Sequence, residues 1–282
     1  VFWSIMTPLA ARVAPFGRQS LGLAMVMGGT IVATVMGVPL GTRLGQIVGW
    51  QGAFFIIGLA AAVIWLVIYF VLPVCESNRA GSLKSLPDLF RRPALVQLYL
   101  LTLVVILGQF TVYSYISPIL TTVTGMAESE TVTVLFVFGI SGIIGTILST
   151  RSLDKHYSMA LLVPLILLTL CLGFFVLSMR QTWTMYVLVV VWGACISAVG
   201  MAFQTLLLNT ARDAADVATS MFSGIFNIGI GGGAFIGSKV SVALGFAAVP
   251  YVGAGLVGVC ALACSLIFCF TGSAVLGAKH RS

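Results

Sequence analysis

Charged side chains are scarce in this sequence. Only 7% of its 282 residues are Asp, Glu, Lys or Arg, whereas 60% are hydrophobic. Soluble domains carry roughly 25% charged residues, so this composition excludes a water-soluble fold. The apolar runs are continuous over about 20 residues rather than alternating, which predicts membrane-spanning helices and excludes a transmembrane barrel.

Motifs of catalysis and metal binding are also missing. The sequence has no nucleophile–base pair, and the glycine run at 229–233 lacks the preceding strand that a dinucleotide site requires. Five of the six cysteines lie inside apolar runs without metal-ligand spacing, where cysteine behaves as a small hydrophobe: Cys171, Cys195, Cys260, Cys264 and Cys269. We therefore predict no enzymatic activity, no metal site and no cofactor.

The hydrophobic pattern predicts the remnant of one membrane-spanning helix near residues 1–14, followed by eight full spans. The full spans are expected at 19–43, 52–72, 94–122, 131–150, 158–178, 183–208, 217–243 and 248–271. Only the joint after residue 72 is long enough to link two halves. The predicted organisation is the last part of an N-terminal bundle at 1–73, a cytoplasmic inter-bundle loop at 74–93, a C-terminal six-helix bundle at 94–272 and a cytoplasmic tail at 273–282.

Positive charge is unequally divided between the two ends of these helices. Eleven of the Lys and Arg residues fall on one set of ends, and only Arg43, Arg180 and Lys239 fall on the other. The positive-inside rule places the first set, with the long loop and the C-terminus, in the cytoplasm. The net charge of +7 could also indicate nucleic-acid binding, but the cations are scattered over short loops and form no stripe.

One unusual sequence motif occurs twice in the chain. GVPLGTRLGQIVGW at 37–50 aligns with GAFIGSKVSVALGF at 233–246 at an offset of 196 residues, so that three glycines, a cation and a final aromatic agree. Chance similarity between glycine-rich membrane helices is the alternative. In a true repeat, residues 1–73 match the last half of a unit whose first half, residues 94–196, has no partner upstream. This predicts roughly a hundred further residues before Val1 in the native protein.

Three further sequence segments resemble those of a known family. They are GSLKSLPDLFRRPAL at 81–95, YSYISP at 113–118 and ATSMFSGIFNIGIGGGAFIGSKVS at 218–241. The chain resembles the major facilitator superfamily, in particular its twelve-helix drug and sugar:proton antiporters, and most closely the bacterial sugar efflux transporters. The resemblance implies an all-α membrane protein with the major facilitator fold, truncated at its N-terminus to a remnant of helix 4 plus helices 5–12. One departure is the valine between Gly37 and Pro39, since the efflux group usually has glycine directly before proline.

This resemblance also implies a function. We expect a monomeric multi-pass protein of the bacterial inner membrane that exports arabinose, lactose or thiogalactoside-like sugars by alternating access, in exchange for protons. Export of other small molecules, including drugs, and a non-transporting membrane sensor remain alternatives. Every acidic residue lies in a joint or at a helix end, so the proton-carrying group is expected in helices that this chain lacks.

Glycines at intervals of four residues suggest a smooth surface on which helices slide. Gly37, Pro39 and Gly41 in the first half, with Gly233 and Gly237 in the second, are the candidates for a gating seam between the two halves. Static helix packing is the alternative for the same residues.

Sugar binding requires hydrogen-bonding groups and aromatic faces within an apolar cavity. Gln109, Tyr113 and Ser117 recur at intervals of four residues, and Pro118 is expected to break their helix. The other candidates are Asn227, Trp3 and Trp192. Each of these polar groups either lines the cavity or hydrogen-bonds a neighbouring helix, because an unpaired polar group in the membrane is costly.

Overall fold

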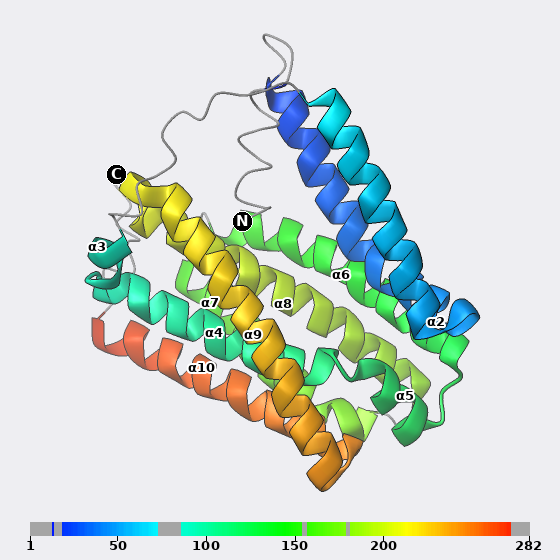
Figure 1. Cartoon of the computed structure of the whole chain (residues 1–282). Helices are drawn as coiled ribbons and strands as arrows, with labels where there is room; N and C mark the ends of the chain where they lie inside the picture. Colours follow the sequence, from blue (N-terminus) through cyan, green and yellow to red (C-terminus); the bar gives the residue numbers. More distant parts are fainter. Residues whose placement is uncertain (1–12, 14–18, 73–85, 154–156, 179–180, 272–282) are drawn as a thin grey trace. The chain divides into compact units, whose positions relative to one another are not determined.

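The computed structural model describes residues 13, 19–72, 86–153, 157–178 and 181–271, and within these ranges every regular element is helical (Figure 1). The order is α2 (Gln19–Val71), α3 (Leu86–Phe90), α4 (Pro93–Tyr113), α5 (Ile116–Thr124), α6 (Glu128–Leu153), α7 (Tyr157–Ser178), α8 (Thr182–Thr210), the 3-10 turn η2 (Arg212–Ala214), α9 (Ala215–Leu244), the 3-10 turn η3 (Phe246–Ala248) and α10 (Val249–Thr271).

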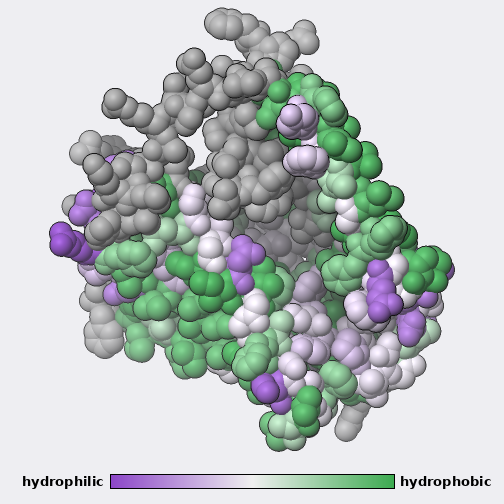
Figure 2. Space-filling model, in the orientation of Figure 1, coloured by the Kyte–Doolittle hydropathy of each residue, from purple (hydrophilic) through white to green (hydrophobic). Residues whose placement is uncertain are grey.

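The described residues include seven helical segments long and apolar enough to cross a membrane. Helices suit this solvent because they satisfy their own backbone hydrogen bonds where water is absent. Apolar side chains cover much of the described surface seen in Figure 2, over α2 and over the later helices. The predicted full spans all fall in helical parts of the structure, and the first two, at 19–43 and 52–72, both fall on the single helix Gln19–Val71. The predicted remnant at 1–14 lies outside the described residues apart from Val13.

The chain divides into two compact units, Val1–Ala80 and Gly81–Ser282. The described part of the first unit is α2, which joins two predicted spans and is drawn in Figure 1 as two helical arms that meet at a sharp bend. Gly49 lies at the junction, with φ 74° and ψ 165°. This backbone conformation is essentially restricted to glycine and reverses the chain without a long loop.

The same backbone conformation recurs in the second unit. Gly245 has φ 84° and ψ 166°, and it ends α9 just before the short turn that leads into α10. Gly49 and Gly245 are 196 residues apart, which is the offset of the sequence repeat. The repeat is therefore present in backbone geometry as well as in residue type.

In the second unit, α4 packs against α9 and α10, α6 packs against α8, and α7 packs against α8 and α10. The predicted span at 94–122 is not one continuous helix. Ser114 and Tyr115 separate α4 from α5, one turn before Pro118. The break has a simple cause, because Pro118 has no N–H to donate to the Ser114 carbonyl and its ring crowds that carbonyl.

A bidentate ion pair ties the start of α4 to the turn between α8 and α9. The Arg92 guanidinium donates to both carboxylate oxygens of Asp213, at 2.8 and 2.5 Å. This hydrogen bonding lowers the pKa of Asp213 to about 2 and raises the pKa of Arg92. Asp213 therefore anchors α4, whereas α9 begins at Ala215 and its N-cap residue, Ala214, makes no side-chain cap hydrogen bond.

Candidate substrate site

The centre of the second unit contains a buried hydrogen bond between α8 and α4. Trp192 is fully buried, and its Nε1 donates to the Gln109 Oε1 at 2.6 Å. An indole N–H in an apolar interior requires an acceptor, and the Gln109 amide supplies it. Two of the candidate residues, which come from helices far apart in sequence, are thus brought into direct contact.

Aromatic rings from five helices surround this hydrogen bond. Trp192 lies in edge contact with Phe138 of α6 and Phe175 of α7, each at a centroid distance of 5.3 Å. Tyr113 packs on Phe138 at 4.9 Å and meets the edge of Trp192 at 6.3 Å. Phe110 extends the cluster to Phe226 of α9, at 6.4 Å. The six rings make an apolar wall that is rigid because each packs on at least one other.

Two polar groups at this wall have no partner within the part of the chain that the structure describes. The Nε2 amide of Gln109 makes no hydrogen bond with the described residues, because only its Oε1 is engaged. The hydroxyl of Tyr113, on the next turn of α4, makes no hydrogen bond with the described residues, although its ring contacts Phe138 and Trp192. Both groups are donors, so they suit a ligand with oxygen acceptors.

The remaining candidates lie apart from this pair. Ser117 is half-buried but belongs to α5, beyond the helix break, so that the single continuous face predicted for Gln109, Tyr113 and Ser117 is interrupted. Asn227 is exposed on α9, and its amide donates to the Ser223 carbonyl of its own helix at 2.7 Å. Trp3 lies outside the described residues.

The candidate seam glycines divide into two groups. A Cβ added to Gly233 would lie 2.6 Å from the Leu107 carbonyl oxygen, and one added to Gly237 would lie 2.6 Å from that of Thr111. These glycines therefore pack on α4 inside the second unit, as the static-packing alternative expects. Among the described residues, no atom outside the local helix backbone lies within 4 Å of the Cβ position of Gly37 or Gly41, so neither glycine is packed against another helix there.

The sequence did not identify the aromatic residues that enclose the pair. Phe110, Phe138, Phe175 and Phe226 lie in different helices, and single phenylalanines in apolar runs are usually packing residues. The only local signal was the three-residue spacing of Phe110 and Tyr113, which places both on one side of α4.

Comparison with known protein families identifies the family to which this helical bundle belongs. The sequence model of the Major Facilitator Superfamily matches residues 1–223, more than half of the chain. The chain belongs to the Major Facilitator Superfamily. It is accordingly a multi-pass membrane transporter, and members of this superfamily are not enzymes.

A solved structure has the same fold. It is described as the crystal structure of a bacterial homolog to the human lysosomal transporter Spinster, in an inward-facing and unoccupied conformation. The two chains are 12% identical with a TM-score of 0.58, and the match covers 96% of this chain and 72% of the other. At this identity the likeness concerns the fold alone.

Proposed function

We propose that this major facilitator transporter exports a sugar and binds it at the aromatic wall of the second unit. The observation that carries the proposal is the pair of unpaired donors, the Gln109 amide and the Tyr113 hydroxyl, beside the rings of Phe138 and Trp192. Sugars offer oxygen acceptors to such donors and apolar C–H faces to such rings. The resemblance of residues 81–95, 113–118 and 218–241 to sugar efflux transporters supports the direction of transport.

Proton exchange is the proposed energy source. Among the described residues, the candidate spans hold no carboxylate except Glu128 and Glu130, both in the first turn of α6. A proton carrier usually needs a buried carboxylate whose pKa is raised by its surroundings. We therefore assign the carrier to none of the described residues.

Alternating access is proposed to use the first-unit glycines. Gly37 and Gly41 are one helical turn apart on α2, on either side of Pro39, so a partner helix can approach and slide along this surface. Leucine at Gly41 would fill that surface. The G41L variant of the full-length protein is expected to insert normally but to lose transport, and undiminished transport would contradict the seam.

Counterflow in proteoliposomes that contain the full-length protein tests the sugar site. Labelled arabinose, lactose or a thiogalactoside is expected to enter vesicles preloaded with the same unlabelled sugar. Q109L removes the free donor together with the acceptor of the Trp192 N–H, and it should weaken binding at least about tenfold, as expected for the loss of one hydrogen bond of roughly 1.4 kcal/mol or more. T111V is the matched control, because the Thr111 hydroxyl is bonded to the Leu107 carbonyl of its own helix.

The outcomes distinguish the alternatives. Absence of counterflow for every sugar, together with efflux of lipophilic cations, would make the protein a drug exporter. Sugar binding without counterflow would make it a sensor. Equal loss in Q109L and T111V would show that the effect comes from helix packing rather than from the sugar site.

A further inference from the structure

The rings of the aromatic wall differ in what they can offer a ligand. Trp192 and Phe175 are fully buried, so protein atoms cover their faces. Phe138 and Tyr113 are only partly buried, and they pack on each other at a centroid distance of 4.9 Å. A sugar needs a ring with an accessible face for its apolar C–H groups. Phe138, which contacts both Tyr113 and Trp192, is therefore a ring on which a sugar can lie.

The position of Phe138 depends on a glycine of the neighbouring helix α8. A Cβ added to Gly193 would lie 2.5 Å from the Phe138 carbonyl oxygen and still closer to the Ser141 Oγ. These two atoms of α6 are joined to each other, because the Ser141 hydroxyl donates to the Phe138 carbonyl at 2.7 Å. The absence of a side chain at Gly193 thus lets the α6 backbone at Phe138 lie directly against α8.

The two neighbours of Gly193 differ in their freedom to move. The Ser141 hydroxyl can rotate away from a new methyl group, whereas the Phe138 carbonyl is fixed in the backbone of α6. That carbonyl would have to retreat by about 1 Å to reach an ordinary van der Waals distance of 3.4 Å. The Phe138 ring moves with its backbone, and binding sites tolerate misplacements of only about 0.5 Å.

We propose that Gly193 is a positioning residue of the sugar site and that it acts by holding the Phe138 ring against Trp192 and Tyr113. This inference rests on the proposed function, since it assigns Gly193 a role in sugar binding. Gly193 directly follows Trp192 in the sequence. One short segment of α8 therefore supplies both the indole that binds Gln109 and the space that seats Phe138.

Counterflow with the full-length protein in proteoliposomes tests this role. G193A is expected to raise the KM for the sugar about fivefold with little change in maximal rate, because the contact with one ring is weakened. F138A should raise the KM at least as much. In the F138A background G193A should have no further effect on the KM, since the ring through which Gly193 acts is already absent.

Fluorine NMR gives a second readout that needs no sugar. In protein labelled with fluorotryptophan, the ring current of Phe138 shifts the fluorine resonance of Trp192, which is identified by its loss in W192F. This resonance is expected to move in G193A, and G193A should not move it in the F138A background. The double variant S141A/G193A removes the nearer obstacle and keeps the Phe138 carbonyl contact, so it should fold more readily and show the same shift.

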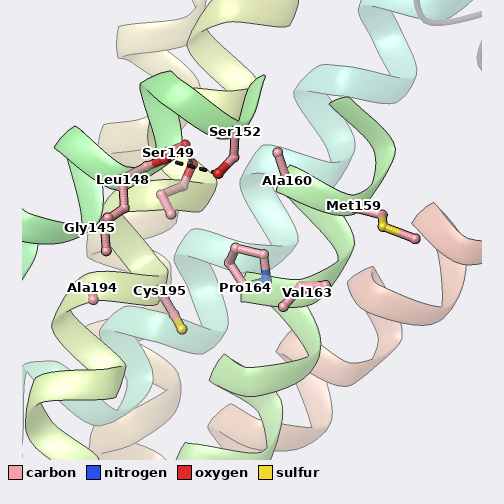
Figure 3. A pocket seen from close by; sticks show the side chains of 11 residues that line it. Gly145, Leu148, Ser149, Ser152, Met159, Ala160, Val163, Pro164, Ala194 and Cys195 are labelled. Carbon is pink, nitrogen blue, oxygen red and sulfur yellow. Dashed lines mark hydrogen bonds between the residues drawn. The ribbon is translucent and has the colours of Figure 1, made fainter. Parts of the chain in front are cut away.

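G145A is the matched control for a general loss of packing between α6 and α8. A Cβ added to Gly145 would lie 2.5 Å from the Ala194 Cα, so this variant disturbs the same pair of helices. Gly145 and Ala194 line a separate cavity of about 560 Å³ between α6, α7 and α8 (Figure 3). Gly145 is seven residues, or about two helical turns, beyond Phe138. G145A should lower the Tm at least as much as G193A but leave the KM and the Trp192 resonance near their wild-type values.

Two results would overturn the role of Gly193. One is an equal change of KM and resonance in G145A and G193A, which would assign the effect to helix packing in general. The other is an effect of G193A that persists in the F138A background. Failure of the proposed function gives a different result, in which the wild type binds no sugar while the fluorine resonance still shows whether Gly193 positions Phe138.

Discussion

The Trp192–Gln109 hydrogen bond shows how one buried donor organises its surroundings. A fully buried indole carries a single N–H, and leaving it unpaired costs more than the hydrogen bond itself contributes. Gln109 satisfies the indole with its carbonyl oxygen and keeps its amide protons available. The bond therefore fixes the rotamer of Gln109 and aims the free amide, so that Trp192 is a positioning residue for the proposed sugar site.

Replacement of Trp192 by phenylalanine should expose this dependence. W192F removes the donor and leaves the Gln109 carbonyl oxygen unpaired in an apolar interior, so the protein is expected to lose about 1–2 kcal/mol of stability. Thermal unfolding in detergent, followed by circular dichroism, measures the loss. W183F is the control because Trp183 is 84% exposed, and an equal loss in both variants would contradict the assigned role.

The Arg92–Asp213 pair predicts a defined pH dependence. Its hydrogen bonds lower the pKa of Asp213 from the ordinary 3.8 to about 2, so the carboxylate stabilises the fold above about pH 4 and loses this effect as pH falls toward 2. The difference in Tm between wild type and D213N should accordingly shrink over that interval. D88N is the control, since the exposed Asp88 is 3.9 Å from Arg91 and such surface pairs contribute little.

At the scale of helices, the contact between α4 and α9 depends on backbone proximity. Membrane helices gain no hydrophobic driving force from each other, so small residues that permit close packing stabilise their association. Gly229, Gly233 and Gly237 form this surface, and each would place an added Cβ less than 3.0 Å from an atom of α4. Tyr115 reinforces the contact by donating to the Ala234 carbonyl at 3.0 Å.

Two neighbouring glycines on α9 allow the effect of close helix packing on stability to be measured separately from the effect of helix propensity. G233A introduces a methyl group 2.6 Å from the Leu107 carbonyl oxygen and is expected to destabilise the protein by about 1–3 kcal/mol. Gly231 has no atom within 4 Å of its Cβ position, so G231A should be neutral or stabilising by up to about 1 kcal/mol. Thermal unfolding of both variants is the measurement, and similar values would refute close packing at Gly233.

At the scale of the whole molecule, the two units repeat one structural device. A long helix ends at a glycine with φ near 80° and continues into another helix within a few residues, at Gly49 in the first unit and at Gly245 in the second. The agreement covers two backbone angles at equivalent sequence positions, which a chance similarity of glycine-rich helices does not explain. Duplication of a helical bundle accounts for it, and parallel repeats of this kind are a property of the major facilitator fold.

Alanine substitution should therefore have the same effect in both units. G49A and G245A each force a side chain into a glycine-only conformation and are expected to cost about 1–3 kcal/mol. G58A is the control because Gly58 lies within the second arm of α2, with a φ outside the positive region and an open Cβ position. Unfolding titrations in SDS measure the losses. A large effect at only one of the two junctions would contradict their structural equivalence.

Composition and hydrophobic pattern determined the solvent, the helical class and the approximate spans, because membrane insertion depends on local apolar length. The sequence also predicted Gln109, Tyr113 and Trp192 as candidates, since polar groups in apolar runs are conspicuous. Only the tertiary structure decided that Gln109 meets Trp192, that Gly233 and Gly237 pack on α4, and that a cavity opens between α6 and α7. These features depend on which helix faces meet in three dimensions, and nearly uniform apolar helices carry little periodicity from which those faces can be predicted.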